Sequence, residues 1–252
     1  MTNRTDDHVL AAEVSAEAGR LLVGLREADG GNDAVALRDR GDRRSHELIV
    51  ARLGAARPGD AVLSEEGADD RDRLDAERVW IVDPLDGTRE FGEPGRRDWA
   101  VHVALAVAGV AVVGAVALPA EGVVLATEPA PPMPPPPDRG LRVVTSRTRN
   151  PAESAAVAEA LGAELVPLGS AGAKAMAVVR GEVDVYVHAG GMYEWDSAAP
   201  VAVAAAAGLH VSRVDGSPLV YNRPDPYLPD VLVCRPELAA ACLATLATLA
   251  PS

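Results

Sequence analysis

The segment VWIVDPLDGTREF (residues 79–91) joins a strongly apolar run to a polar stretch that carries two aspartates. Its first four residues are typical of a buried β-strand, which we expect to end at Asp83. Pro84 removes a backbone N–H donor and favours an extended or turn conformation. The pattern therefore predicts that Asp83 and Asp86 face one point at the end of a buried strand.

Backbone groups in the same segment complete a candidate phosphate site. The carbonyl of Leu85 lies between the two aspartates and offers a further oxygen ligand. Gly87 and Thr88 present backbone N–H groups where the next helix or turn begins, and such amides bind phosphate well. Carboxylates for a metal beside free amides for a phosphate indicate hydrolysis of a phosphate ester.

Further acidic residues also follow apolar stretches. Glu65 and Glu66 end the run AVLSEEG, and Asp196 begins a helical pattern after MYEW. Carboxylates that gather in a partly buried site repel one another, and Mg²⁺ with its oxygen ligands removes that repulsion. Each acidic position taken alone is more typical of a solvated turn, a surface charge pair or a helix start, so the prediction depends on their combination.

The composition supports a full core built from small side chains. Of the 252 residues 48% are hydrophobic, yet only one is Phe. The formal net charge of −13 argues against sequence-independent binding to nucleic acid, which requires a basic face. A small phosphorylated substrate is compatible with this charge, because metal ions would allow it to approach an acidic site.

We identify no signal for secretion or membrane insertion. The start MTNRTDDHVL lacks the basic-then-apolar layout of a signal peptide. The most apolar stretch, Val101 to Pro119, contains His102 and internal glycines, which suit strands better than a membrane span. Cys234 and Cys242 are expected to be buried thiols rather than a disulfide. We expect a cytoplasmic protein with no membrane partner.

The periodicity along the chain predicts an α/β protein with no internal repeats. Helices are expected at residues 9–26, 43–57, 151–161, 170–180 and 195–207, with Asp42 at the N-cap position of the second. Strands are expected at 61–67, 79–82, 121–127, 141–147, 163–168 and 183–188, with a hairpin at 101–118 and a polar surface stretch at 68–78.

One proline-rich stretch divides the chain. Residues 128–139 cannot pack in a helix or a sheet, so we expect an exposed loop there. It separates a lobe at 1–127, with the metal and catalytic motifs, from a lobe at 140–252, with the substrate side and the last metal ligand. We expect both lobes to form a single domain over residues 1–252.

Three motifs stand in the order that a known family shows. They are SEEG at 64–67, DPLDGT at 83–88 and EWDSAA at 194–199. Together they resemble the inositol monophosphatase superfamily, whose members are Mg²⁺-dependent, lithium-sensitive phosphomonoesterases. The resemblance covers nearly the whole chain. It implies the layered αβαβα sandwich of the inositol monophosphatase and fructose-1,6-bisphosphatase type, and a homodimer.

The residues after DPLDGT indicate the branch. The tail TREF resembles the CysQ-type 3′(2′),5′-bisphosphate nucleotidases, whereas inositol monophosphatases usually have Asn-Phe where this chain has Glu90-Phe91. This resemblance implies hydrolysis of 3′-phosphoadenosine 5′-phosphate to AMP in sulfate assimilation, and of its sulfated precursor. An inositol-1-phosphate or fructose-1,6-bisphosphate phosphatase is the alternative. A metal-dependent binding protein without turnover is a third interpretation, which the complete set of expected ligands disfavours.

The resemblance also implies roles for individual residues. Two or three Mg²⁺ ions would be held by Glu65, Asp83, the carbonyl of Leu85, Asp86 and Asp196, with Asp83 bridging two of them. Asp42, Glu65 and Thr88 would be catalytic, and Thr88 with Asp42 would orient the attacking water. Gly87, Thr88, Ser170, Lys174, His188 and Glu194 would bind the substrate, while His188 could equally be a plain histidine of the pocket wall. Trp195 is expected to pack in the core.

Overall fold

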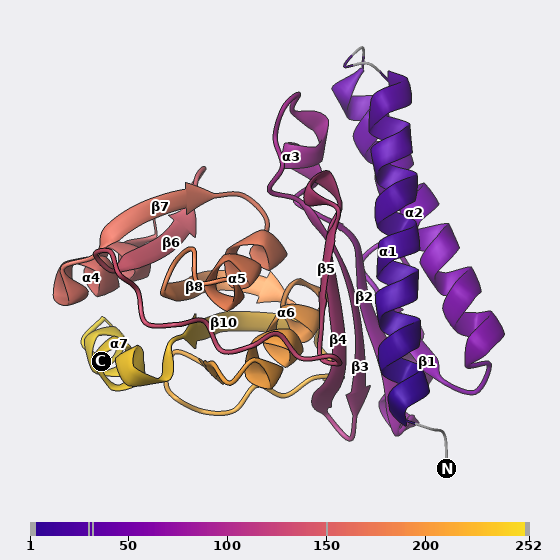
Figure 1. Cartoon of the computed structure of the whole chain (residues 1–252). Coiled ribbons are helices and arrows are strands. Elements are labelled where there is room, and N and C mark those ends of the chain that lie inside the picture. The colour runs from indigo at the N-terminus through magenta and orange to yellow at the C-terminus, as the bar shows by residue number, and fades with distance from the viewer. Residues whose placement is uncertain (1–3, 30, 32, 150, 250–252) are drawn as a thin grey trace.

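The computed structural model describes residues 4–29, 31, 33–149 and 151–249, which form five layers of alternating helices and sheets (Figure 1). The first layer is the helix pair α1 (Arg4–Asp29) and α2 (Ala34–Ala56). The second is a sheet of β1 (Ala61–Ser64), β2 (Arg78–Asp86), β3 (Ala100–Val107), β4 (Val110–Leu118) and β5 (Val123–Ala126). The short helix α3 (Thr88–Gly92) follows β2 directly.

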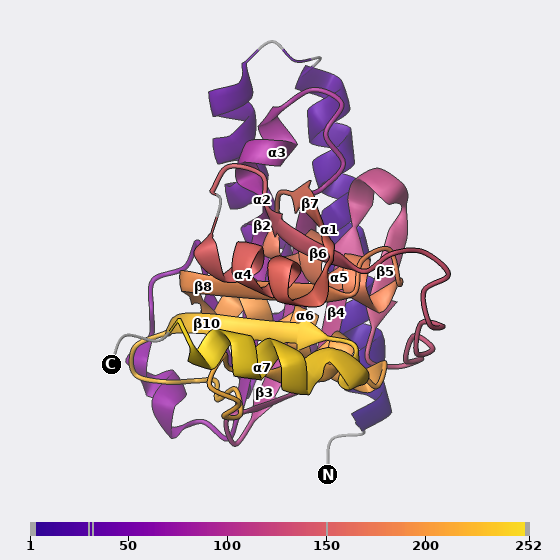
Figure 2. The ribbon, with the colours of Figure 1, turned by 90° about the vertical axis from the view of Figure 1, so that its left-hand side faces the viewer.

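The other three layers come from the second half of the chain (Figure 2). Helices α5 (Ala171–Val179) and α6 (Glu194–Ala206) lie between the two sheets, and α4 (Ala152–Leu161) and α7 (Ala239–Ala247) cover the outer face. The second sheet contains β6 (Arg142–Ser146), β7 (Glu164–Leu168), β8 (Val185–Tyr193), β9 (His210–Ser212) and β10 (Tyr227–Cys234). The αβαβα sandwich expected from the sequence is thus confirmed. The described residues also include three 3₁₀ turns: η1 (Arg71–Asp75), η2 (Pro119–Glu121) and η3 (Pro236–Leu238).

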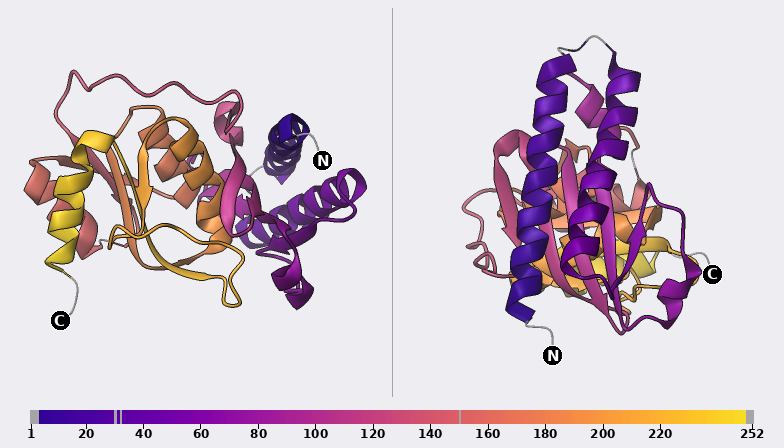
Figure 3. Two further views of the ribbon diagram at one scale, coloured as in Figure 1. Left: turned by 90° about the horizontal axis from the view of Figure 1, so that it is seen from below. Right: turned by 90° about the vertical axis from the view of Figure 1, so that its right-hand side faces the viewer.

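Both sheets are mixed. The strand order is β1-β2-β3-β4-β5 in the first sheet, where only β1 and β2 are parallel, and β7-β6-β8-β10-β9 in the second. In the second sheet β6 runs parallel to β7 and β8, while β10 is antiparallel to β8 and β9. The views from below and from the right show α1 and α2 on one face of the first sheet only (Figure 3).

Strand β2 is buried on both faces, which explains its continuous apolar run. Trp80 and Val82 pack into the core under α1 and α2. Val79 and Ile81 point the other way, into the core shared with α5 and α6. The abundance of Ala and Gly lets these layers approach closely, since a Cβ at Gly114 of β4 would lie 2.7 Å from the Ala199 carbonyl oxygen of α6.

Most expected elements are present, including the hairpin of β3 and β4 and the loop at residues 128–139. That loop is held by Arg235 Nη1, which donates to the Pro135 carbonyl over 2.9 Å, and by Arg139 Nη1, which donates to Asp184 Oδ2 over 2.7 Å. Cys234 and Cys242 are buried free thiols, as expected. Among the described residues no helix is both long and apolar enough to cross a membrane.

The start of α2 corrects one prediction. The helix begins at Ala34 with Asp33 as its N-cap, whose side chain accepts from the Ala36 amide over 3.0 Å, so Asp42 lies inside the helix. Gly41 therefore also lies inside the helix, where it serves close packing. A Cβ at Gly41 would lie 2.8 Å from Phe91 Cε1, which shows why the helix has a glycine there.

Two further boundaries differ from the sequence prediction. Strand β2 continues past Asp83 to Asp86, with a register shift between these two residues where Pro84 interrupts the ladder. The stretch at 68–78 is not wholly surface, because Arg73 is only 1% exposed and donates to Asp69 and Asn222. An arginine can be buried in this way when its donors are satisfied by oxygen atoms.

Candidate active site

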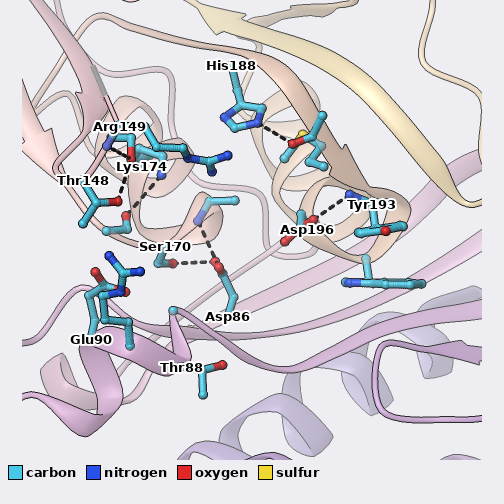
Figure 4. Close-up of a pocket in the computed structure, with 18 of the residues that line it drawn as sticks. Asp86, Thr88, Glu90, Thr148, Arg149, Ser170, Lys174, His188, Tyr193 and Asp196 are labelled. Atoms are coloured by element: carbon cyan, nitrogen blue, oxygen red, sulfur yellow. Dashed lines mark hydrogen bonds between the residues drawn. The ribbon is translucent and has the colours of Figure 1, made fainter. Parts of the chain in front are cut away.

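A pocket of about 590 Å³ takes its walls from both sheets (Figure 4). One wall comes from the turn after β1 and from the β2–α3 junction, and the other from the loops after β6 and β7 and from α5, β8 and α6. Most of the site residues expected from the sequence line it: Glu65, Asp86, Gly87, Thr88, Ser170, Lys174, His188 and Asp196. The structure therefore brings together residues that are up to 131 positions apart, from Glu65 to Asp196.

Three aspartates converge at this pocket, two of which, Asp86 and Asp196, line it. Asp83, Asp86 and Asp196 each offer a carboxylate oxygen, and these oxygens all lie within 4.8 Å of one another. The first two stand at the bulged end of β2, and Asp196 stands in the first turn of α6, where its Oδ2 accepts from the Tyr193 amide over 2.7 Å. The sequence predicted that Asp83 and Asp86 face one point, and the structure shows this. Asp196 joins them from α6, which lies between the two sheets.

The bulge at the end of β2 is fixed by local hydrogen bonds. Asp83 Oδ1 accepts from the Leu85 amide over 3.0 Å, and Ser45 donates to the Pro84 carbonyl over 2.7 Å. The carbonyl of Leu85 accepts from Thr88 Oγ1 over 3.0 Å. A carbonyl oxygen has a second lone pair, so this bond leaves room for the ligand role expected of Leu85.

Asp86 is held mainly by the start of α5. Its Oδ2 accepts from the Ser170 hydroxyl and from the Gly172 amide, and its Oδ1 accepts from the Ala171 amide over 3.0 Å. Burial would raise the pKa of Asp86, but the charge and hydrogen bond of His102, together with these donors, lower it to about 2. Asp86 is thus the one aspartate of the three whose charge the protein itself stabilises.

His102 was not identified as a site residue from the sequence. Its Nε2 lies 3.2 Å from Asp86 Oδ2, and its Nδ1 donates to the Trp195 carbonyl over 3.0 Å. Burial acts to lower the pKa of His102, but the charge of Asp86 outweighs it and raises that pKa. A Cβ at Gly172 would lie 2.0 Å from His102 Nε2, so glycine is required there. The signal in the sequence was a single ionisable side chain within a long apolar strand pattern.

The remaining carboxylates carry more negative charge than the protein neutralises. Burial raises the pKa of Asp83 well above its usual range, and the charges of Glu65 and Asp86 raise it further. Burial and the charge of Asp86 raise the pKa of Asp196 to about 6. Desolvation and the charge of Asp196 raise the pKa of Glu65 to about 7.

This donor set fits a hard divalent cation. Several carboxylate oxygens converge, the raised pKa values of Asp83 and Asp196 are those expected of carboxylates without a counter-charge, and sulfur or neutral imidazole ligands are absent from the described cluster. Glu65, Asp83, Asp86 and Asp196 are the side chains that would hold it. The sequence prediction of a metal site is therefore consistent with the geometry.

Thr88 and Asp42 stand together beside the pocket, although Asp42 arrives from the middle of α2. Thr88 Oγ1 lies 3.4 Å from Asp42 Oδ1. Burial and the charge of Glu66 raise the pKa of Asp42 to about 7. Gly87 precedes Thr88 with a φ of 83°, in the left-handed region that favours glycine, and a Cβ there would lie 3.0 Å from that of Ser170.

The opposite side of the pocket carries basic and polar groups. Lys174 is 5% exposed, its Nζ donates to the Gly169 carbonyl over 3.4 Å and lies 5.5 Å from the centroid of the Tyr186 ring, and burial lowers its pKa. The hydroxyl of Tyr186 is buried without a hydrogen-bond partner among the described residues. Arg149 also lines this side. Neither Tyr186 nor Arg149 was predicted, because only the folded arrangement places them beside Lys174.

Two other expected residues, His188 and Ser170, also have defined surroundings. His188 Nε2 lies 2.9 Å from the Gly191 carbonyl oxygen, and burial lowers the pKa of His188. The Ser170 hydroxyl is occupied, since it donates to Asp86 and accepts from the Ala173 amide.

Glu194 corrects the expectation of a direct substrate contact. It is fully buried, and its carboxylate accepts from the backbone amides of Asn222 and Arg223 over 2.7 and 2.8 Å. The expectation for Trp195 also changes. It lines the pocket and stacks on Tyr193, with ring centroids 4.8 Å apart and planes 10° apart, rather than lying fully in the core.

Comparison with known proteins identifies the family of this chain. The profile of the inositol monophosphatase family matches residues 9–249. The 3′-phosphoadenosine 5′-phosphate phosphatase of Mycobacterium leprae is 51% identical over 95% of this chain and 93% of its own length. The 3′(2′),5′-bisphosphate nucleotidase CysQ of Escherichia coli is 30% identical over 74% of this chain and 80% of its own length.

Solved structures show the same fold. The structure of CysQ from Bacteroides thetaiotaomicron superposes with a TM-score of 0.78 at 29% identity, over 91% of this chain and 97% of that one. The SuhB structure from Mycobacterium tuberculosis gives a TM-score of 0.71 at 24% identity over 98% of both chains. On the family profile and the relative at 51% identity, this chain belongs to the inositol monophosphatase family.

Proposed function

We propose that this protein is a Mg²⁺-dependent phosphomonoesterase that hydrolyses 3′-phosphoadenosine 5′-phosphate to AMP and phosphate. The observation that carries the proposal is a single pocket with a carboxylate cluster on its floor and Lys174, Arg149 and Tyr186 on the opposite side. A substrate with two separate anionic groups matches this division. The names of the relatives at 51% and 30% identity support the same substrate class.

The site residues would divide into metal ligands and residues that activate the attacking water. Glu65, Asp83, Asp86, Asp196 and the Leu85 carbonyl would hold two or three Mg²⁺ ions, which when bound supply positive charge that stabilises the phosphoryl and leaving oxygens. Asp42 accepts a hydrogen bond from Thr88 at the pocket edge, where the pair could orient a water and accept its proton. The pKa of Asp42, raised to about 7, suits a group that exchanges a proton near neutral pH.

Gly87 and Thr88 line the pocket where α3 begins, and their backbone amides would contact the scissile phosphate. The Tyr186 hydroxyl is buried without a hydrogen-bond partner among the described residues, and Lys174 uses one of its three donors on the Gly169 carbonyl, so a bound ligand would give both groups further hydrogen bonds. Such groups favour a polar ligand over an apolar one, because an unpaired buried donor is costly. His188 completes this wall and would contact the sugar or the base.

A side-by-side assay tests the function. Purified protein with Mg²⁺ is given 3′-phosphoadenosine 5′-phosphate, its sulfated precursor, inositol-1-phosphate and fructose-1,6-bisphosphate, and kcat/KM is compared. We expect the bisphosphate nucleotide to be preferred by at least tenfold, and the activity to require added Mg²⁺ and to fall with lithium. A preference for inositol-1-phosphate or fructose-1,6-bisphosphate would replace the proposal with that alternative.

Asp83→Asn is the matching site test. It preserves the shape of the side chain and its bond to the Leu85 amide but removes a charge from the cluster. We expect kcat to fall by at least a hundredfold, and undiminished Mg²⁺-dependent turnover would show that the site is elsewhere. We also propose that the chain forms a single domain and that two copies form a homodimer. Analytical ultracentrifugation measures the oligomeric state.

A further inference from the structure

The glutamate of the TREF motif pairs with an arginine from the other sheet. Glu90, in α3, is 5% exposed, and its Oε1 accepts from Arg147 Nε over 2.5 Å. The same Arg147 donates through Nη2 to the more exposed Glu93, over 2.6 Å. Arg147 directly follows β6, so this ion pair ties the β2–α3 junction of the first sheet to a strand end of the second.

The pair requires a glycine beside it. A Cβ at Gly169 would lie 2.3 Å from Glu90 Cδ and 2.5 Å from Glu90 Oε1. Gly169 is also the residue whose carbonyl accepts from Lys174 Nζ. Glu90 therefore fills the space directly beside the β7–α5 connection that leads into the pocket.

Arg147 belongs to the short segment that supplies Arg149, residues 146–149. The Arg147 amide donates to the Leu168 carbonyl over 3.1 Å, and the Arg149 amide donates to Ser146 Oγ over 3.3 Å. Thr148 and Arg149 then line the pocket, although Arg149 is an exposed residue with a long, flexible side chain. Figure 4 shows Glu90 and Arg149 on the side of the pocket away from Tyr193.

We propose that Glu90 is a positioning residue: through Arg147 it holds segment 146–149 so that Arg149 meets the second, non-reacting anionic group of the substrate. This inference rests on the proposed function, because only a substrate with two anionic groups would use Arg149 in this way. Holding the segment in place before binding reduces the ordering cost that Arg149 would otherwise incur when the substrate arrives.

The charge of Glu90 supports this indirect role. A carboxylate at the wall of a pocket for a phosphorylated substrate would repel that substrate if it were free. Its ion pair with Arg147 offsets that charge, and Arg89, Arg149 and Lys174 are positive groups that line the pocket. Glu90 thus acts on specificity without needing to touch the nucleotide.

Kinetics on two nucleotides test the proposal. Glu90→Gln, Arg147→Gln and the double variant are compared on 3′-phosphoadenosine 5′-phosphate and on adenosine 3′-monophosphate, which lacks the second phosphate. We expect each single variant to raise KM for the bisphosphate five- to tenfold with kcat within twofold, and to change KM for the monophosphate by less than twofold. The double variant should be no worse than either single one.

Glu93→Gln is the matched control, since it removes only the outer contact of Arg147, and KM should stay within twofold. Equal effects on both nucleotides, or an additive double variant, would overturn the positioning role. So would a KM for the bisphosphate that rises in Glu90→Gln but not in Arg147→Gln, because that result would mean that Glu90 contacts the substrate itself.

A second measurement separates this inference from the proposed function. Hydrogen–deuterium exchange at the amides of residues 147–149 reports how firmly the segment is held, with no substrate present. Exchange should accelerate at least fivefold in Glu90→Gln and remain unchanged in Glu93→Gln, and unchanged exchange in both would refute the inference. If the wild type prefers a different phosphate ester, the proposed function fails even when the exchange result holds.

Discussion

Two aspartates that touch the same centre should have opposite effects on the stability of the metal-free protein. Replacement of Asp196 by Asn removes a charge that the fold tolerates poorly, since burial and the charge of Asp86 raise the pKa of Asp196 to about 6 from 3.8. Replacement of Asp86 by Asn removes a charge that the fold stabilises, since His102 and the start of α5 lower the pKa of Asp86 to about 2.

The magnitudes follow from these pKa values. For Asp196 the difference corresponds to about 3 kcal/mol of destabilisation at neutral pH, which Asp196→Asn should relieve. Asn can still accept from the Tyr193 amide, so little is lost. For Asp86 the difference corresponds to about 2 kcal/mol of stabilisation, which Asp86→Asn should remove. The new amide would also place N–H groups against the donors of Ser170 and Gly172, at further cost.

The two effects depend on pH in opposite ways. A raised pKa favours folding below the unfolded value near 4 and loses that contribution as pH rises through 6, so the advantage of Asp196→Asn should appear between pH 4 and 6 and persist above. A lowered pKa favours folding above about pH 4 and loses that contribution as pH falls through 2. The deficit of Asp86→Asn should therefore be complete at neutral pH and shrink in strong acid.

Urea unfolding in the presence of a chelator, followed by tryptophan fluorescence from pH 4 to 8, measures both effects. Asp196→Asn should be more stable than the wild type at pH 8 but nearly inactive with Mg²⁺, and Mg²⁺ should stabilise it less than it stabilises the wild type. Asp230→Asn, which breaks a paired contact with Arg213 away from the site, should destabilise with no change in the response to Mg²⁺. An Asp196→Asn protein less stable than the wild type at pH 8 without metal would refute the reasoning.

Three further substitutions probe neighbouring features. Thr88→Ala should lower kcat on the bisphosphate nucleotide at least tenfold while Thr88→Ser retains most of it, because the hydroxyl contacts Asp42 at the pocket edge. Gly41→Ala should lower the free energy of unfolding by about 1–3 kcal/mol, measured in urea, because its Cβ would lie 2.8 Å from Phe91 Cε1. Tyr186→Phe should raise KM severalfold in steady-state assays yet leave the free protein equally or more stable in thermal unfolding, because it removes a buried hydroxyl without a partner in the described structure.

The local sequence pattern was sufficient to predict those helices and strands whose residues all favour the same secondary structure. The side chains of the apolar run before Asp83 alternate between two cores. Local patterns also predicted the hairpin of β3 and β4 and the helix that begins beside Asp196. The cluster of three aspartates also followed from sequence, because each lies at an element end where a polar group can face a pocket. The resemblance of the motifs to a known family then predicted that these element ends lie close together.

What local pattern could not supply was the effect of distant packing. The sequence pattern placed the start of the second helix after Asp42, whereas the helix begins at Ala34 and includes Gly41, whose lack of a Cβ leaves room for the ring of Phe91. The extension of β2 to Asp86 has a similar cause. Pro84 alone suggests that the strand ends there, but the partner strand β3 and the start of α5 hold the strand in place beyond a bulge.

The pairing of Asp86 with the start of α5 also bears on how the site and the fold depend on each other. Its hydrogen-bond donors lie 84 to 86 residues away in sequence, and His102 joins it from the neighbouring strand. The same contact therefore closes the packing between the first sheet and the central helices and removes the excess charge from one aspartate of the cluster. Asp83 and Asp196 accept fewer hydrogen bonds than Asp86 does. Their negative charges are therefore left for a bound cation to neutralise. Stabilisation by the fold at one aspartate and by a bound cation at the others would allow this centre to be both rigid and responsive to metal.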